Sequence, residues 1–102
     1  GAETPILNPT SSEGDVTYPY DAPIEIPADR HMMLLEIPYD FSSIEIAAPD
    51  VAIQWKQHIR DGLVIMLRAS YVVTDFVVDE YEGRVRAFYL LSFNGPQSTI
   101  QF

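Results

Sequence analysis

The chain contains no cysteine, which excludes disulfides and thiolate metal sites. It also has few basic residues, with six lysines and arginines against fifteen acidic residues, giving a net charge of −9 at pH 7. Nucleic acids and anionic membrane surfaces are bound by clustered lysine and arginine, so we predict neither as a partner. No apolar run reaches the roughly 18 residues of a membrane-spanning helix, and no signal peptide is visible. We therefore expect a cytoplasmic protein without a membrane segment.

The usual self-contained catalytic and metal-binding motifs are also missing. His31 and His58 are the only histidines, and they show none of the spacings of a metal site, so we predict no metal. The pair Ser42–Ser43 lacks the flanking glycines of a nucleophile elbow. No glycine-rich phosphate loop is present. The sequence thus contains no complete catalytic constellation of its own.

What is present fits a single small globular domain, with 102 residues and 47% hydrophobic content. The charge is distributed unevenly along the chain. Residues 1–50 carry ten acidic residues and one base, whereas residues 51–102 carry five of each. This acidic first half permits a cationic substrate or a basic protein surface as a partner, although an acidic balance is common in soluble proteins.

Residues 1–29 contain five of the eight prolines and differ in composition from the rest of the chain. Proline fixes φ and removes a hydrogen-bond donor, so we expect an extended arm that forms no regular ladder. Its apolar residues indicate that the arm packs on the body or on another chain. We place the domain boundary after this arm and assign residues 30–102 to an α+β domain.

The run Met32–Ile37 is almost continuously apolar and predicts a strand that is buried on both faces. An apolar stripe with helical spacing then predicts a helix from Pro49 to Ala69, with Trp55 in the core. Gly62 within this helix either allows close packing or marks a bend. The connector before the helix includes a possible short strand, Ser43–Ile46.

The last part of the chain predicts a hairpin. Strands at 71–78 and 85–93 flank a turn at 79–83, with opposite charges across the two strands, and residues 98–102 form a possible last edge strand. The expected fold is a small β-α-β-β unit, with one long helix packed on a mixed sheet. In isolation its strand around Met32–Ile37 would expose an edge that invites pairing with another chain.

Four residues are candidates for a functional site. Glu36 lies in the buried strand, where desolvation would raise the pKa of a carboxyl toward that of a general base; alternatively it pairs with an arginine. Asp75 interrupts an apolar strand and either lines a cleft or lies on a solvated face. Arg60 on the helix either grips a carboxylate or phosphate, or is solvated. Tyr39, in the connector, is a candidate for the substrate side.

Several short motifs, taken in order, resemble a little-described branch of the GNAT (GCN5-related) N-acetyltransferases. The resemblance covers roughly residues 7 to 93 and depends on the order and spacing of these pieces rather than on any one of them. The matching pieces are Leu7-Asn8-Pro9-Thr10, Leu35-Glu36-Ile37-Pro38, Ala52 with Trp55 and Arg60, Tyr71 to Phe76, and Tyr89-Leu90-Leu91.

This resemblance implies the C-terminal half of the GNAT fold, with Met32–Ile37 as its fifth strand. The implied activity is acyl transfer from acetyl-CoA or another acyl-CoA to an amine, with Glu36 as candidate base and Tyr39, Asp75 and Arg60 as candidate substrate residues. In that fold the cofactor lies between the fourth and fifth strands, and its pyrophosphate sits on a glycine-containing loop that has no counterpart here. The helix tyrosine that often acts as general acid in the family is replaced by Met66, which cannot donate a proton.

The chain alone is therefore expected to be inactive, and its cofactor residues are not identified by the sequence. The acyltransferase reading requires an N-terminal part, on the same or a partner chain, and a small amine as acceptor. The alternative reading is a non-catalytic α+β interaction module, with a homodimer formed by exchanged strands or arms.

Overall fold

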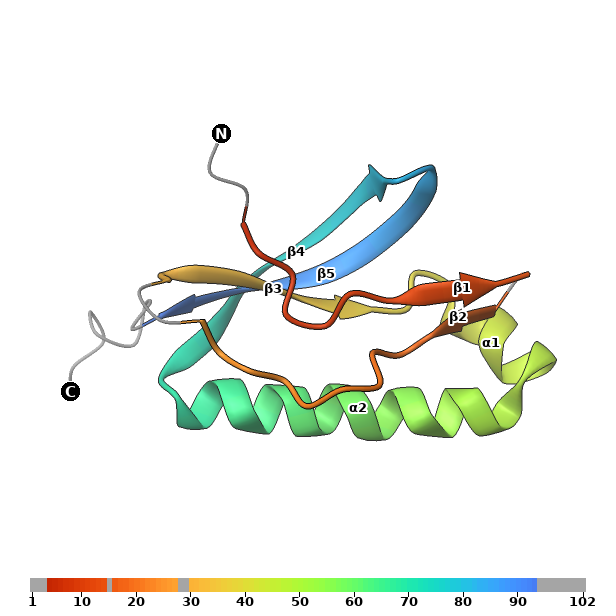
Figure 1. Cartoon of the computed structure of the whole chain (residues 1–102), viewed down its shortest axis with the longest axis horizontal. Coiled ribbons are helices and arrows are strands. Elements are labelled where there is room, and N and C mark those ends of the chain that lie inside the picture. Colours follow the sequence, from red (N-terminus) through yellow and green to blue (C-terminus); the bar gives the residue numbers. More distant parts are fainter. Residues whose placement is uncertain (1–3, 15, 28–29, 94–102) are drawn as a thin grey trace.

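The computed structural model describes residues 4–14, 16–27 and 30–93. Over these ranges the chain folds into an α+β domain with two antiparallel sheets and two helices (Figure 1). The elements are β1 (Ser11–Glu13), β2 (Val16–Tyr18), β3 (Met32–Ile37), α1 (Phe41–Ala47), α2 (Pro49–Arg68), β4 (Tyr71–Tyr81) and β5 (Arg84–Phe93). Among these residues, no helix is both long and apolar enough to cross a membrane.

The main sheet has the strand order β3-β5-β4, so the second strand of the hairpin lies in the centre. Both of its pairings are antiparallel. An isolated parallel bridge, outside the named strands, joins Ile6 of the arm to Leu34 on the other edge of β3. There the Leu7 N–H donates to the Leu34 carbonyl, and the Leu34 N–H donates to the Pro5 carbonyl, both at 2.9 Å.

The predicted strand β3 and helix α2 are confirmed, α2 ending one residue earlier than expected. Met33 and Leu35 of β3 pack with Met66 of α2 in one core cluster, and Trp55 is fully buried in a second cluster. Gly62 lies where a side chain would meet the methyl groups of Ile24 and Leu35, with a Cβ at 3.1 Å from each. Close packing therefore accounts for this helical glycine.

The connector between β3 and α2 is a helix, so the expected strand at Ser43–Ile46 is wrong. Asp40 caps α1, accepting hydrogen bonds from the Ser43 N–H at 3.2 Å and the Ser43 hydroxyl at 2.7 Å. An aspartate with this local bonding pattern favours a helix start over an extended strand. Ile44 on this helix is buried, which fixes α1 against the N-terminal half of α2.

The arm also contains regular structure, contrary to expectation. β1 and β2 form a short hairpin whose residues all lie between Pro9 and Pro19, so no proline has to donate to its ladder. The arm packs on its own chain: Ile24 and Ile26 contact the core cluster that contains Leu35. The edge of β3 expected to be exposed is thus partly covered by the arm. The domain boundary after residue 29 stays a prediction.

The main hairpin is longer and its turn tighter than predicted. β4 continues to Tyr81, and only Glu82 and Gly83 form the turn, with φ of 54° and 78°. Two positive φ values suit a two-residue hairpin turn whose twist matches the strands. A β-bulge between Val73 and Asp75 also breaks the strict alternation assumed for β4. The strand proposed at 98–102 lies outside the described residues.

Candidate functional site

The centre of the candidate site is a buried ion pair between Glu36 on β3 and Arg86 on β5. The guanidinium forms a two-pronged contact with the carboxylate, from Nη2 to Oε1 at 2.7 Å and from Nε to Oε2 at 2.8 Å. Both side chains are buried. A third contact, at 2.8 Å, joins Arg86 Nη1 to the exposed carboxylate of Glu82. The hydrogen bonds that Arg86 donates to Glu36 are the main reason that the pKa of Arg86 is raised.

The N-terminal arm supplies two further donors to the same carboxylate. The Thr10 N–H donates to Glu36 Oε1 at 3.0 Å, and the Thr10 hydroxyl donates to Oε2 at 2.7 Å. Each carboxylate oxygen therefore accepts two hydrogen bonds. An incoming amine would have to displace one of these donors before Glu36 could accept its proton. The role of Glu36 as a general base stays a prediction, while its pairing with an arginine, the alternative reading, is observed.

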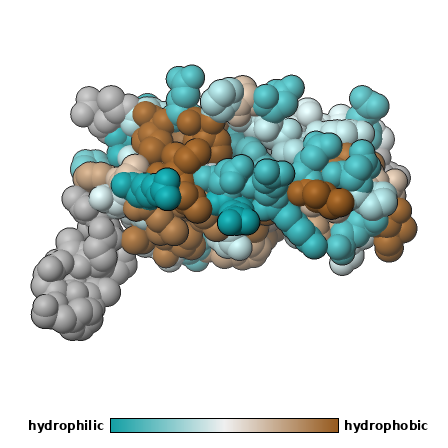
Figure 2. All heavy atoms as spheres, turned by 90° about the horizontal axis from the view of Figure 1, so that it is seen from below, coloured by the Kyte–Doolittle hydropathy of each residue, from teal (hydrophilic) through white to brown (hydrophobic). Residues whose placement is uncertain are grey.

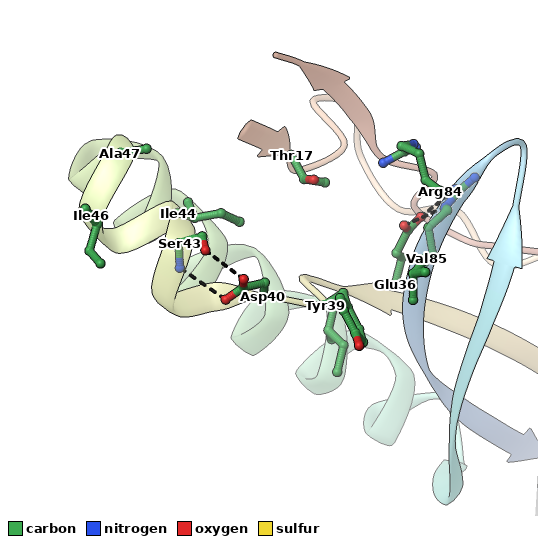
Figure 3. A pocket seen from close by; sticks show the side chains of 12 residues that line it. Thr17, Glu36, Tyr39, Asp40, Ser43, Ile44, Ile46, Ala47, Arg84 and Val85 are labelled. Atoms are coloured by element: carbon green, nitrogen blue, oxygen red, sulfur yellow. Dashed lines mark hydrogen bonds and ion pairs between the residues drawn. The ribbon is translucent and has the colours of Figure 1, made fainter. Parts of the chain in front are cut away.

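A cavity of about 500 Å³ lies beside this ion pair (Figure 3). β3, the connector, α1 and the first residues of β5 form most of its wall, and one residue of the arm hairpin completes it. Its lining residues are Thr17, Glu36, Ile37, Tyr39, Asp40, Ser43, Ile44, Ile46, Ala47, Arg84, Val85 and Arg86. The volume suits a small molecule.

The cavity presents both signs of charge. Asp40 is exposed, and its hydrogen bonds from Ser43 lower the pKa of its carboxyl, so it carries a negative charge at neutral pH. Arg84 is half-buried and contacts the Thr10 hydroxyl at 3.2 Å. Tyr39, which directly precedes Asp40 in the chain, also lines the cavity and is 61% exposed. Such a wall can orient a small polar molecule that contains an amine and an acidic group.

The structure brings together two of the four candidate residues. Glu36 and Tyr39 line the same cavity. Asp75 is exposed on β4, accepts a hydrogen bond from the Phe76 N–H, and does not line this cavity. Arg60 is exposed and lines a separate hollow along α2. Asp75 and Arg60 are thus both exposed to solvent, which was the alternative expected for each.

Sequence reasoning did not identify Arg86 as the partner of Glu36, nor Asn8 and Thr10 as its neighbours from the arm. A signal for the arginine existed: Arg84 and Arg86 alternate at the start of a strand and therefore share one face. The contacts of the arm had no such signal, because they join residues that are 26 and 28 positions apart. Within the described ranges, no group of three or more acidic, histidine or cysteine residues is placed to hold a metal ion.

Asn8 fastens the arm to the main body through three hydrogen bonds. Its Oδ1 accepts from the Glu36 N–H at 2.6 Å, and its Nδ2 donates to the Glu36 carbonyl at 2.9 Å. These two bonds fix the orientation of the amide. The same Nδ2 lies 2.9 Å from His58 Nε2 on α2, so Nε2 must be the unprotonated, accepting nitrogen. Protonated His58 would place two donors against each other.

We expect stability to decrease as pH falls below about 6.5, because of His58. Burial lowers its pKa from the ordinary value of 6.5, against an opposing effect of Asp61, and the ring packs edge-on to Trp55. The unfolded chain then binds more protons than the folded chain over this window, so acid favours unfolding. Urea unfolding at a series of pH values from about 7.5 down to 5 tests this.

The substitution His58→Gln should flatten this pH dependence, because glutamine can accept the Asn8 hydrogen bond without titrating. His31→Gln, at an exposed histidine, is the matched control and should leave the dependence as in the wild type. A His58→Gln variant that keeps the full loss of stability between pH 6.5 and the acid end would show that other groups cause it.

Comparisons with known proteins give no relative for this chain. No protein-family model matches it, no curated protein is significantly similar to it, and no solved structure matches its fold significantly.

Proposed function

We propose that the chain is the C-terminal portion of a GNAT-like N-acyltransferase and provides the acceptor side of its site. The observation that carries the proposal is the connectivity: a strand, a long helix and an antiparallel hairpin follow one another, with the order β3-β5-β4. The resemblance in sequence implies the same succession of fifth strand, helix and last two strands. The parallel bridge of Ile6 to Leu34 lies on the edge of β3 where a fourth strand would pair.

In this proposal the cavity beside Glu36 and Arg86 binds the amine acceptor. Asp40 attracts the ammonium group, Tyr39 covers the apolar part of the molecule, and Arg84 binds a carboxylate if the acceptor has one. Acyl transfer forms an amide bond, breaks the thioester and releases CoA; the amine loses a proton and the leaving CoA thiolate takes one up. The remaining part of the fold, on the same or a partner chain, supplies the binding site of the acyl-CoA.

Nuclear magnetic resonance titration of the purified chain tests this proposal. We expect acetyl-CoA to bind weakly to the part of its site that this chain provides, with a Kd on the order of 0.1–1 mM, and to shift amide signals along β3. Primary amines and amino acids should shift the signals of the cavity wall at Tyr39–Ser43 and Arg84. ATP is the control for binding through phosphates alone.

Asp40→Asn should weaken amine binding roughly tenfold while leaving acetyl-CoA binding intact. Among the described residues, Asp40 is the cavity carboxylate that forms no ion pair. Glu45→Gln, on the same helix but outside the cavity wall, is the charge-matched control. If acetyl-CoA at about 5 mM shifts no signal beyond those moved by ATP, the acyltransferase proposal is contradicted.

A second proposal is a non-catalytic interaction module, favoured by the apolar side chains that remain exposed. Several lie on α2 and others on the hairpin, where Phe76 is 55% exposed. Figure 2 shows apolar groups gathered over the half of the face where α2 ends. The homodimer with exchanged arms stays part of this proposal, because a swapped arm would form the same contacts between two chains. The mass of the chain in solution tests it, and a monomer at micromolar concentration would exclude the exchange.

A further inference from the structure

The outer edge of β4 is the longest unpaired strand edge within the described part of the chain. β4 ends the order β3-β5-β4, is eleven residues long, and pairs on one side only, with β5. A free edge presents unpaired N–H and C=O groups, which can pair with an added strand. The corresponding edge of β3 is partly covered by the arm. The hairpin also rises away from α2 toward its turn, so the helix does not cover its far half (Figure 1).

The two faces of β4 carry opposite chemistry. Cross-strand partners point to the same face, so Val73, Phe76 and Val78 share the face of Leu91, Tyr89 and Ala87, on which α2 packs. These three β4 side chains are 45%, 55% and 44% exposed. Asp75 and Asp79 lie on the opposite face and are exposed.

Neither aspartate has a cationic partner among the described residues. Each accepts a hydrogen bond from the N–H of the next residue, at 2.8 Å. Asp79 lies opposite Arg86 in the ladder, but the guanidinium of Arg86 binds Glu36 and Glu82 instead. One face of the outer strand therefore shows the two unpaired aspartates, with the half-buried Val77 between them. The other face shows the three exposed apolar side chains, with the exposed Glu80 beyond them near the turn.

We propose that this edge binds an extended segment of another protein by strand addition, and that the segment alternates apolar and basic residues. Its apolar side chains contact Val73, Phe76 and Val78, and its lysines or arginines pair with Asp75 and Asp79. The backbone groups of β4 supply the hydrogen bonds. This inference rests on the proposed interaction module and is independent of acyl transfer.

A second copy of the chain fits this edge poorly. Two β4 strands side by side would place four aspartates on one face, within a protein of net charge −9. The bulge between Val73 and Asp75 also shifts the alternation of side chains along β4. In a two-fold antiparallel pairing over the full strand, residues beyond the bulge would point to opposite faces. A basic segment meets neither obstacle.

Synthetic peptides test the proposal with the full chain. A nine-residue peptide that alternates valine and lysine should bind with a Kd on the order of 10–100 µM and shift the amide signals of β4. A peptide of the same composition, with all lysines in one block, should bind at least about tenfold more weakly, because it cannot match both faces. Methylation of alternate backbone nitrogens on the edge facing β4 should abolish binding.

The double substitution D75N/D79N should weaken binding of the alternating peptide roughly three- to tenfold. The control E13Q/E25Q removes the same charge at exposed positions of the arm and should leave the affinity unchanged. All four substitutions are at exposed residues, so the variants are expected to fold.

Three results would overturn the proposal. Equal binding of the alternating and block peptides would indicate attraction by net charge alone. Equal losses in D75N/D79N and E13Q/E25Q would indicate the same. Slow hydrogen exchange at the outward amides of β4 in the free chain would show an edge that is already paired; the mass of the sample then assigns it to a second copy or to the chain itself. Failure of the peptides does not affect the acetyl-CoA titration, so the two proposals fail separately.

Discussion

Replacing Arg86 with methionine should lower the free energy of unfolding by about 3–5 kcal/mol, because it leaves the buried Glu36 carboxylate without its charged partner. The whole stability of a small domain is about 5–15 kcal/mol, so the variant should be close to unfolding at room temperature. The guanidinium also lies 5.8 Å from the ring of Tyr81 and 5.9 Å from that of Phe88. Urea unfolding followed by the fluorescence of Trp55 measures the loss.

Arg84→Met is the matched control, since Arg84 begins β5 on the same face as Arg86 and, among the described residues, its side chain hydrogen bonds only to Thr10. It should cost about 1 kcal/mol or less. The double variant Glu36→Leu with Arg86→Met should recover part of the loss, because replacing a buried ion pair with apolar residues is often neutral. The recovery is incomplete, since the Thr10 N–H and hydroxyl then lose their acceptor. An Arg86→Met variant as stable as Arg84→Met would contradict a structural role for the pair.

The recovery in the double variant also separates two roles of Glu36. A stable double variant that no longer supports acyl transfer in a completed enzyme would assign chemistry to the ion pair, in which Glu36 is the candidate base. If turnover in an active complex is unchanged on substitution of Glu36, its role as a base is wrong. The hydrogen bonds from Thr10 and Arg86 favour a structural role, because together they occupy both carboxylate oxygens.

The elements that were predictable from the sequence are those whose patterns are long. β3 is an almost continuous apolar run of six residues, and the apolar stripe of α2 repeats over several helical turns. Both patterns agree with the local propensity of their residues. The α+β class follows from them. The short elements were not predicted correctly. α1 has only seven residues and depends on the cap from Asp40, and each strand of the arm hairpin has three residues. Patterns of that length do not distinguish helix from strand.

The site was predictable only in part, for a related reason. A glutamate within an apolar strand is predicted either to pair with a cationic side chain or to have a functional role. The sequence of β3 alone therefore indicates that Glu36 is unusual. The identity of the partner depends on the register of β3 against β5, which places Glu36 opposite Phe88 and next to Arg86. The contacts of Asn8 depend on the path of the arm over β3 and α2. No local pattern encodes such a path, because its contacts are distant in the sequence.

Asn8→Leu should lower the free energy of unfolding by about 2–5 kcal/mol. Leucine has a similar size but cannot hydrogen bond, so the Glu36 N–H and carbonyl and the His58 ring would each lose their partner. Each unsatisfied buried group costs about 1–3 kcal/mol. Hydrogen exchange measured by nuclear magnetic resonance should be faster at the amides of Thr10, Leu34 and Glu36. Each of these N–H groups donates a hydrogen bond that joins the arm to β3.

The amides between β4 and β5 provide the internal reference for this variant. Their ladder does not involve the arm, so their exchange should follow global stability only, whereas the arm contacts should open by a separate local step. Ser12→Ala, an exposed change in the arm hairpin, should alter stability by less than about 0.5 kcal/mol. Equal acceleration at the arm and in the hairpin would mean that the arm is an integral part of one cooperative domain. Faster exchange at the arm contacts alone would mean that the arm around Asn8 detaches from β3 without unfolding of the domain. A strand of a partner chain could then take its place on the edge of β3.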